Sequence, residues 1–137
     1  MDKIAIIPAR SGSKGLKDKN IIELCGKPML VYSIESAIKS GKFKKVIVST
    51  DSERYAQIAS EAGAEILLRD ERLSNDLATT YLVIEDVLKR TNSLEDYFVL
   101  LQPTSPLRTE LHINQALELF EEHIDSFDFL VSMKVAE

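Results

Sequence analysis

A basic segment that contains glycine follows the first apolar run of the chain, in the sequence KIAIIPARSGSKGLKDKN at residues 3–20. Beyond the apolar run it combines two glycines, two serines and four basic side chains, namely Arg10, Lys14, Lys17 and Lys19. Glycine lets backbone N–H groups turn toward one point, while guanidinium and ammonium groups neutralise negative charge. An anion with several phosphate groups needs this combination. The segment therefore predicts a polyphosphate site.

The distribution of charge agrees with a small anionic ligand. The whole chain has a net charge of -5, yet residues 1–45 carry ten Lys and Arg against four Asp and Glu, or +6. The remainder carries seven against eighteen, or -11. A nucleic-acid-binding protein normally has a basic face and a basic balance, so we expect no nucleic acid as a partner.

The two standard phosphate-binding patterns do not match this segment. SGSKGLKDKN does not fit G-x-x-x-x-G-K-[ST], and Gly12 and Gly15 do not make G-x-G-x-x-G. The same physical logic holds without either pattern, because the glycines, the backbone amides and the basic side chains are all present.

A second polar cluster occurs in LQPTSPLR, residues 101–108. Hydrogen-bonding side chains alternate there with two prolines; they are Gln102, Thr104, Ser105 and Arg108. Proline fixes its own φ and stiffens the loop, so polar groups are held in place before a ligand arrives.

The elements that must position these clusters alternate between apolar runs and amphipathic segments. Strands are predicted at residues 3–9, 44–50, 65–68, 96–102 and 128–134, with helices at 26–41, 51–64, 74–90 and 109–123. Strands that are apolar on both faces, separated by helices, indicate a mostly parallel α/β sheet covered by helices on both faces. Ligands bind at the carboxyl ends of such strands, where the polar loops should converge. Asp51 or Ser52 is expected to cap the second helix.

Length and composition bound the class of protein. With 137 residues the chain is expected to form one domain, residues 1–137. No run approaches the roughly 20 apolar residues of a membrane span, and no secretory signal pattern occurs at the start. The single cysteine, Cys25, excludes an internal disulfide, favours a cytoplasmic location and is expected to be a small buried side chain.

Five segments carry a family resemblance. IIPARSGSKGLKDKN, GKPMLVYSIESA, VIVSTDSE, LLRDERLSND and VLLQPTSPLR resemble, in order and spacing, the motifs of acylneuraminate cytidylyltransferases, the CMP-sialic acid synthetases. The resemblance implies a Rossmann-like nucleotidyltransferase fold. It also implies that CTP and a sialic acid give CMP-sialic acid and pyrophosphate with Mg²⁺, in a protein that is a homodimer at full length.

The resemblance also implies residue roles. Arg10 and Lys19 would hold the triphosphate and act in catalysis, and Ala9, Ser13 and Asn20 would bind the nucleotide. Arg69 and Thr80 would frame the cytosine and ribose. Gln102 would contact both substrates and act in catalysis, while Thr104 and Ser105 would bind the sugar. The anomeric hydroxyl of the sugar would attack the α-phosphorus of CTP in line.

The resemblance implies that members of the family continue beyond this point, and that their later half supplies much of the sugar pocket, a dimerisation element and a pair of aspartates that bind the metal. We therefore expect the nucleotide-binding part of a cytidylyltransferase, apparently truncated at its C-terminal end, with weak CTP binding and little turnover. No metal ligands are expected here, because Asp51, Asp70 and Asp76 fall on separate loops.

Several alternatives stay open. The acceptor could be legionaminic or pseudaminic acid, or the chain could be a non-catalytic nucleotide-binding module. Arg69 could instead form a surface ion pair with Asp70 or Glu71, and Thr80 could be an ordinary polar residue in a helix. Tyr55 and Tyr81 are expected to pack rather than stack on a base.

Overall fold

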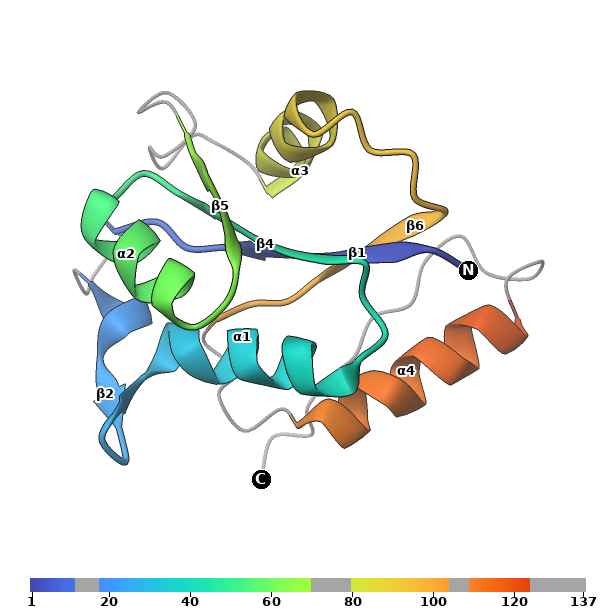
Figure 1. Ribbon diagram of the computed structural model, residues 1–137, viewed down its shortest axis with the longest axis horizontal. Helices are drawn as coiled ribbons and strands as arrows, with labels where there is room; N and C mark the ends of the chain where they lie inside the picture. Colours follow the sequence, from blue (N-terminus) through green and yellow to red (C-terminus); the bar gives the residue numbers. More distant parts are fainter. Residues whose placement is uncertain (12–17, 70–79, 104–108, 124–137) are drawn as a thin grey trace.

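The fold is a parallel sheet between two layers of helices, seen in a computed structural model that describes residues 1–11, 18–69, 80–103 and 109–123. Four strands lie in the order β5-β4-β1-β6, and every neighbouring pair is parallel (Figure 1). The strands are β1 (Lys3–Pro8), β4 (Lys45–Thr50), β5 (Glu65–Leu68) and β6 (Tyr97–Leu100).

Three helices cover one face of the sheet and a fourth covers the other (Figure 1). The first layer holds α1 (Met29–Ser40), α2 (Glu53–Glu61) and α4 (Glu110–Glu122), and the second holds α3 (Thr80–Arg90). Along β1, Ala5 and Ile7 enter the larger core with α1, α2 and α4, whereas Ile4 and Ile6 pack with Val87 of α3. Both faces of the strand are buried, which explains its unbroken apolar sequence.

Local signals set the helix ends. Ser52 is the N-cap of α2, because its side chain accepts a hydrogen bond from the backbone N–H of Tyr55 at 3.2 Å. Of the two residues expected to cap this helix, Asp51 and Ser52, Ser52 is therefore the cap. Thr109 caps α4 by accepting the N–H of His112. α1 ends at Gly41, which has a φ of 67° that glycine adopts without strain.

A short hairpin was not predicted. The 3-10 helix η1 (Lys19–Ile21) leads into β2 (Glu23–Leu24), which pairs antiparallel with β3 (Lys27–Pro28). Cys25 and Gly26 form the turn of the hairpin, with φ of 54° and 80°. Cys25 is exposed, so the expectation that it would be a buried side chain is wrong. The helix expected from residue 26 begins at Met29. Tyr81 is 69% exposed and does not pack, whereas Tyr55 is buried as expected.

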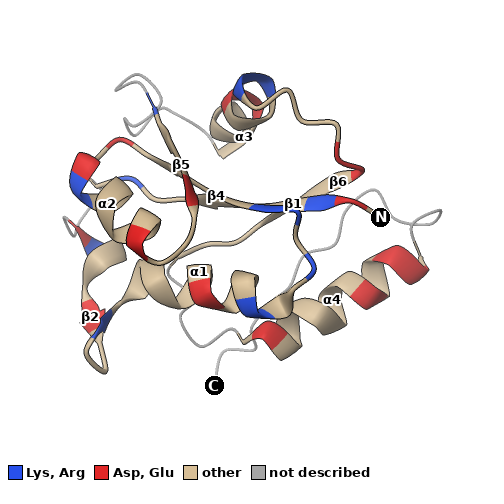
Figure 2. Ribbon diagram, viewed as in Figure 1, with Lys and Arg blue, Asp and Glu red and all other residues tan. Residues whose placement is uncertain are grey.

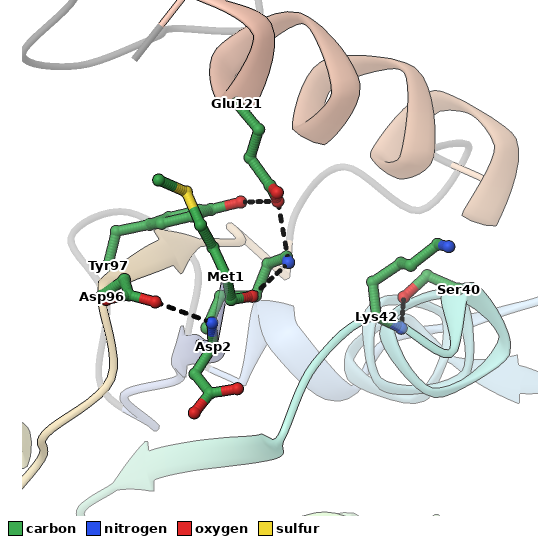
Figure 3. Close-up of polar contacts among 8 residues, drawn as sticks. Met1, Asp2, Ser40, Lys42, Asp96, Tyr97 and Glu121 are labelled. Atoms are coloured by element: carbon green, nitrogen blue, oxygen red, sulfur yellow. Dashed lines mark hydrogen bonds and ion pairs between the residues drawn. The ribbon is translucent and has the colours of Figure 1, made fainter. Parts of the chain in front are cut away.

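The amino ends of the strands carry an ion pair that joins the sheet to α4. Lys3 is almost wholly buried, and its Nζ lies 2.8 Å from Oε2 of Glu121 and donates to the carbonyl of Met1 at 2.7 Å. The Tyr97 hydroxyl donates to the same Glu121 carboxylate (Figure 3). The amino edge of the sheet is thus held to α4 by an ion pair and a hydrogen bond.

The described charges are unevenly placed. α4 carries acidic side chains and no Lys or Arg (Figure 2), which accounts for part of the negative balance expected after residue 45. Lys14 and Lys17 lie outside the described residues, as do the strand predicted at 128–134 and residues 74–79 of the third predicted helix. Among the described helices, none is both long and apolar enough to span a bilayer.

Candidate functional site

The carboxyl ends of the four strands meet at one edge of the sheet, opposite the Lys3 ion pair. β1 leads into Arg10, β4 into Asp51, β5 into Arg69 and β6 into Gln102. The chain winds outward from β1 through β4 to β5 and then returns to place β6 on the other side of β1. Such a reversal is the position at which open α/β sheets bind ligands.

Backbone hydrogen bonds extend the ladders past the strand ends and fix the residues that follow. The N–H of Ala9 donates to Ser49 O at 2.9 Å, that of Arg69 to Thr50 O at 2.9 Å, and that of Leu101 to Ile6 O at 3.0 Å. The backbone on which the site side chains are mounted is therefore part of the sheet. This is the rigid support that a preorganised site requires.

Two arginines follow different strands at this edge. Arg69 is 8% exposed, and its Nε has no hydrogen-bond partner among the described residues. Burial lowers the pKa of Arg69, and the positive charge of Arg10 lowers it further, while the carboxylate of Asp51 opposes the shift. Arg69 is buried rather than on the surface, and its alternative partners Asp70 and Glu71 lie outside the described residues, so an ion pair with either stays a prediction. Two guanidinium groups at the same edge of the sheet favour an anionic ligand.

Asn20 lies beside Arg10 and offers an unused acceptor. It is 4% exposed, and its Nδ2 donates to the backbone carbonyl of Arg10 at 3.1 Å, which fixes the orientation of the amide. Within the part of the chain that the structure describes, its Oδ1 is buried without a hydrogen-bond partner. Buried polar atoms are almost always hydrogen-bonded, so Oδ1 is a candidate acceptor for a ligand hydroxyl or amine.

The structure brings together most of the described residues that the sequence nominated. Those that it places at the carboxyl edge or bonded to it are Ala9, Arg10, Asn20, Arg69 and Gln102. Lys19 lies between Asp18 and Asn20, which are both bonded to the segment that follows β1. Gln102 is exposed, and its carbonyl accepts from the hydroxyl of Ser33 at 3.4 Å. Thr80 is the exposed first residue of α3, so its role stays a prediction. Ser13, Thr104 and Ser105 lie outside the described residues.

Two residues make contacts at the site that the sequence did not predict. Asp51 or Ser52 was expected to cap the second helix; Ser52 is the cap, and the Asp51 carboxylate accepts two hydrogen bonds from Ser11. Tyr55 was expected only to pack, but its hydroxyl also donates to Asp18. The pairs are separated by 40 and 37 residues. The only local signal was that Asp51 immediately follows a strand.

A metal ion would need several oxygen, nitrogen or sulfur ligands close together. In the part of the chain that the structure describes, no group of three or more His, Cys, Asp or Glu side chains is placed to hold a metal ion. The Asp51 carboxylate already accepts from Ser11.

Comparison with known proteins gives consistent matches. Residues 4–137 match the family described as Cytidylyltransferase. The chain is 48% identical to the N-acylneuraminate cytidylyltransferase of Escherichia coli O18:K1:H7 over 95% of this chain and 30% of that protein. It is 38% identical to the pseudaminic acid cytidylyltransferase of Campylobacter jejuni over 94% of this chain and 57% of that protein.

A solved structure shares the fold. The CMP:2-keto-3-deoxy-manno-octonic acid synthetase complexed with CTP superposes with a TM-score of 0.76 at 24% identity, covering 89% of this chain and 48% of that one. The expected α/β nucleotidyltransferase fold is confirmed. The chain spans about a third of the length of the Escherichia coli relative and about half that of the Campylobacter relative.

Proposed function

We propose a function from the premise that this chain belongs to the cytidylyltransferase family, as the match over residues 4–137 shows. The chain holds the nucleotide-binding part of an enzyme that transfers a cytidylyl group from CTP to an N-acylneuraminate, giving CMP-sialic acid and pyrophosphate. The 48% identity to an N-acylneuraminate cytidylyltransferase supports the activity. The observation that carries the proposal is that Arg10, which follows β1, and the buried Arg69, which follows β5, both lie at the carboxyl edge of the sheet.

We assign the parts of CTP to described residues from the positions of those residues in the fold. Arg10 and Lys19 bind the triphosphate, because they extend from two segments that are hydrogen-bonded to each other. Arg69, mounted on the next strand but one, reaches the nucleoside side of the site. The free Oδ1 of Asn20 accepts a hydrogen bond, so it suits a ribose hydroxyl better than a phosphate oxygen.

Catalysis follows from charge. A bond forms between the anomeric oxygen of the sugar and the α-phosphorus, while the bond from the α-phosphorus to the pyrophosphate oxygen breaks and the proton of the anomeric hydroxyl passes to water. Negative charge grows on the leaving pyrophosphate, and fixed cationic groups that contact it more strongly in the transition state lower the barrier. Arg10 and Lys19 supply that effect, and Gln102 contacts the incoming sugar at the end of β6.

Three further properties belong to the proposal. Mg²⁺ would neutralise triphosphate charge when bound, with carboxylate ligands from outside the described residues. The full-length protein would be a homodimer, and it would work in the cytoplasm, where CTP is available.

The proposed function is tested by calorimetric titration of the chain with CTP, UTP, ATP and GTP in the presence of Mg²⁺. We expect measurable binding of CTP and at least tenfold weaker binding of the other three. Equal binding of all four would indicate a generic phosphate site, and no binding of CTP would overturn the proposal.

The acceptor sugar has a second candidate. The identity of 38% to a pseudaminic acid cytidylyltransferase favours pseudaminic acid as the alternative. Pyrophosphate release, measured with CTP and either N-acetylneuraminic or pseudaminic acid, distinguishes the two. We expect the larger rate with N-acetylneuraminic acid.

A further inference from the structure

Two side-chain pairs connect the segments that carry Arg10 and Lys19 to β4 and α2. Ser11, next to Arg10, donates its backbone N–H to Oδ1 of Asp51 at 2.8 Å and its hydroxyl to Oδ2 at 3.1 Å. The carboxylate thus holds both the backbone and the side chain of Ser11. This interaction fixes the direction in which the chain leaves β1.

The second pair acts on the other segment. Asp18, next to Lys19, accepts a hydrogen bond at Oδ1 from the hydroxyl of Tyr55 at 2.9 Å. Asp18 has a φ of 59°, a left-handed conformation that aspartate tolerates better than most residues but still adopts rarely. The bond from Tyr55 therefore helps to hold the chain in the conformation from which η1 begins.

The two segments are also bonded to each other. The N–H of Asp18 donates to the carbonyl of Ser11 at 2.9 Å, and Nδ2 of Asn20 donates to the carbonyl of Arg10 at 3.1 Å. The spacing between Arg10 and Lys19 is consequently set by a closed network rather than by either segment alone.

The anchors of the network are rigid. Tyr55 is fully buried in the first turn of α2 and belongs to the larger core, and burial together with the Asp18 carboxylate raises its pKa. Ser52, the cap of α2, donates its own N–H to Oγ1 of Thr50 at the end of β4. Asp51 thus lies between a strand and a capped helix, which leaves its backbone little freedom.

The charge of Asp51 needs an explanation in a site for phosphate. An unpaired carboxylate would repel the ligand, but both of its oxygens accept hydrogen bonds from Ser11, and its field acts on Arg69. The negative charge of the carboxylate is therefore partly offset by its hydrogen bonds and by Arg69, which reduces its repulsion of a bound phosphate.

We propose that Asp51 and Tyr55 are positioning residues, which hold Arg10 and Lys19 at the spacing that the triphosphate requires before CTP binds. The inference rests on the proposed function and deepens it. Groups that are ordered in advance lose less conformational entropy on binding, so the network raises affinity without contacting the ligand.

The test compares CTP and CMP binding in matched variants. Asp51→Ala and Tyr55→Phe remove one anchor each. Their controls lie at the opposite edge, where Asp96 accepts the N–H of Asp2 at 2.9 Å and Tyr97 donates to Glu121. The controls are Asp96→Ala and Tyr97→Phe. We expect the Kd for CTP to rise about tenfold in Asp51→Ala and about threefold in Tyr55→Phe, in line with the loss of hydrogen bonds that involve a charged group.

The comparison with CMP distinguishes a loss of the positions of Arg10 and Lys19 from a general disruption of the nucleotide site. CMP lacks the pyrophosphate, so its Kd should change less than threefold in both variants, and neither control should change either Kd. Asp51→Asn keeps an acceptor for the Ser11 N–H and should recover most of the CTP affinity. CTP affinities equal to those of the controls, or equal losses for CTP and CMP, would overturn the inference. If the unmodified chain bound no CTP, the proposed function itself would fail, which is a different result.

Discussion

Arg69 is a charged side chain at a buried position, and burial disfavours the charged form. The side chain is 8% exposed, and its Nε has no hydrogen-bond partner in the described ranges of the chain. Burial and the charge of Arg10 lower its pKa. A charged group in such a place costs folding free energy. Residues of this kind persist where a ligand uses them.

Arg69→Met tests this trade between stability and binding. Methionine keeps most of the apolar stem and removes the buried charge, so we expect the free energy of unfolding to stay level or rise by about 1 kcal/mol. The Kd for CTP should rise at least tenfold. Urea unfolding and calorimetry on the same preparation measure the two quantities. A loss of stability with unchanged affinity would show that Arg69 is structural.

Arg10 is expected to have the larger effect on binding. Arg10→Ala removes a cationic group that a neighbouring segment cannot replace, and we expect CTP binding to fall below detection by calorimetry. Lys89→Ala removes the same charge from an exposed pair with Glu85 on α3 and serves as the control. An Arg10→Ala variant that bound CTP as well as Lys89→Ala would remove Arg10 from the site.

At the scale of elements, α2 supports the site through its N-terminus. Ser52 caps the helix, and the turn it opens carries Tyr55, whose hydroxyl reaches Asp18. The stability of this turn and the order of the binding segments are therefore linked.

Ser52→Ala should lower the free energy of unfolding by about 1 kcal/mol, the usual cost of losing an N-cap. Ser60→Ala, at an exposed position near the end of the same helix, is the control and should cost nothing measurable. Thermal unfolding followed by circular dichroism gives both values. Equal midpoints in the two variants would contradict the assignment of the cap.

The same scale shows what could be predicted from the sequence. Each strand of the described sheet was predicted, because runs such as KIAIIP are apolar on both faces. The hairpin at Glu23–Pro28 was not, since strands of two residues carry no periodicity. The carboxyl edge was predicted from loop composition. The pairs of Asp51 with Ser11 and of Tyr55 with Asp18 were not, because only the folded chain brings them together.

At the scale of the molecule, the two edges of one sheet have different tasks. The amino edge holds α4 through the ion pair of Lys3 with Glu121 and through the contact of Tyr97 with Glu121, the second of which Figure 3 shows. The carboxyl edge presents Arg10 and Arg69. The hydrogen bond from Lys3 and then that from Tyr97 hold the pKa of Glu121 below its usual 4.5. A lowered pKa in the folded state means that the stabilisation is present above the unfolded pKa and is lost as the pH falls through the folded pKa.

We therefore expect the free energy of unfolding to fall as the pH drops below about 4.5, and to fall less steeply in Glu121→Gln. Urea unfolding at several pH values between about 3 and 7 measures the slope. CTP affinity at pH 7 should be the same in both proteins, because Glu121 lies at the other edge. Parallel slopes would exclude Glu121 as a source of the pH dependence.

The central claim is that the carboxyl edge of the sheet binds CTP. Titration of the ¹⁵N-labelled chain with CTP, followed by amide chemical shifts, tests it directly. The account predicts that the amides of Arg10, Asn20 and Arg69 shift in a saturable way while those of Lys3, Asp96 and Tyr97 do not. Saturable shifts confined to the amino edge, or no shifts at Arg10 and Arg69, would contradict it.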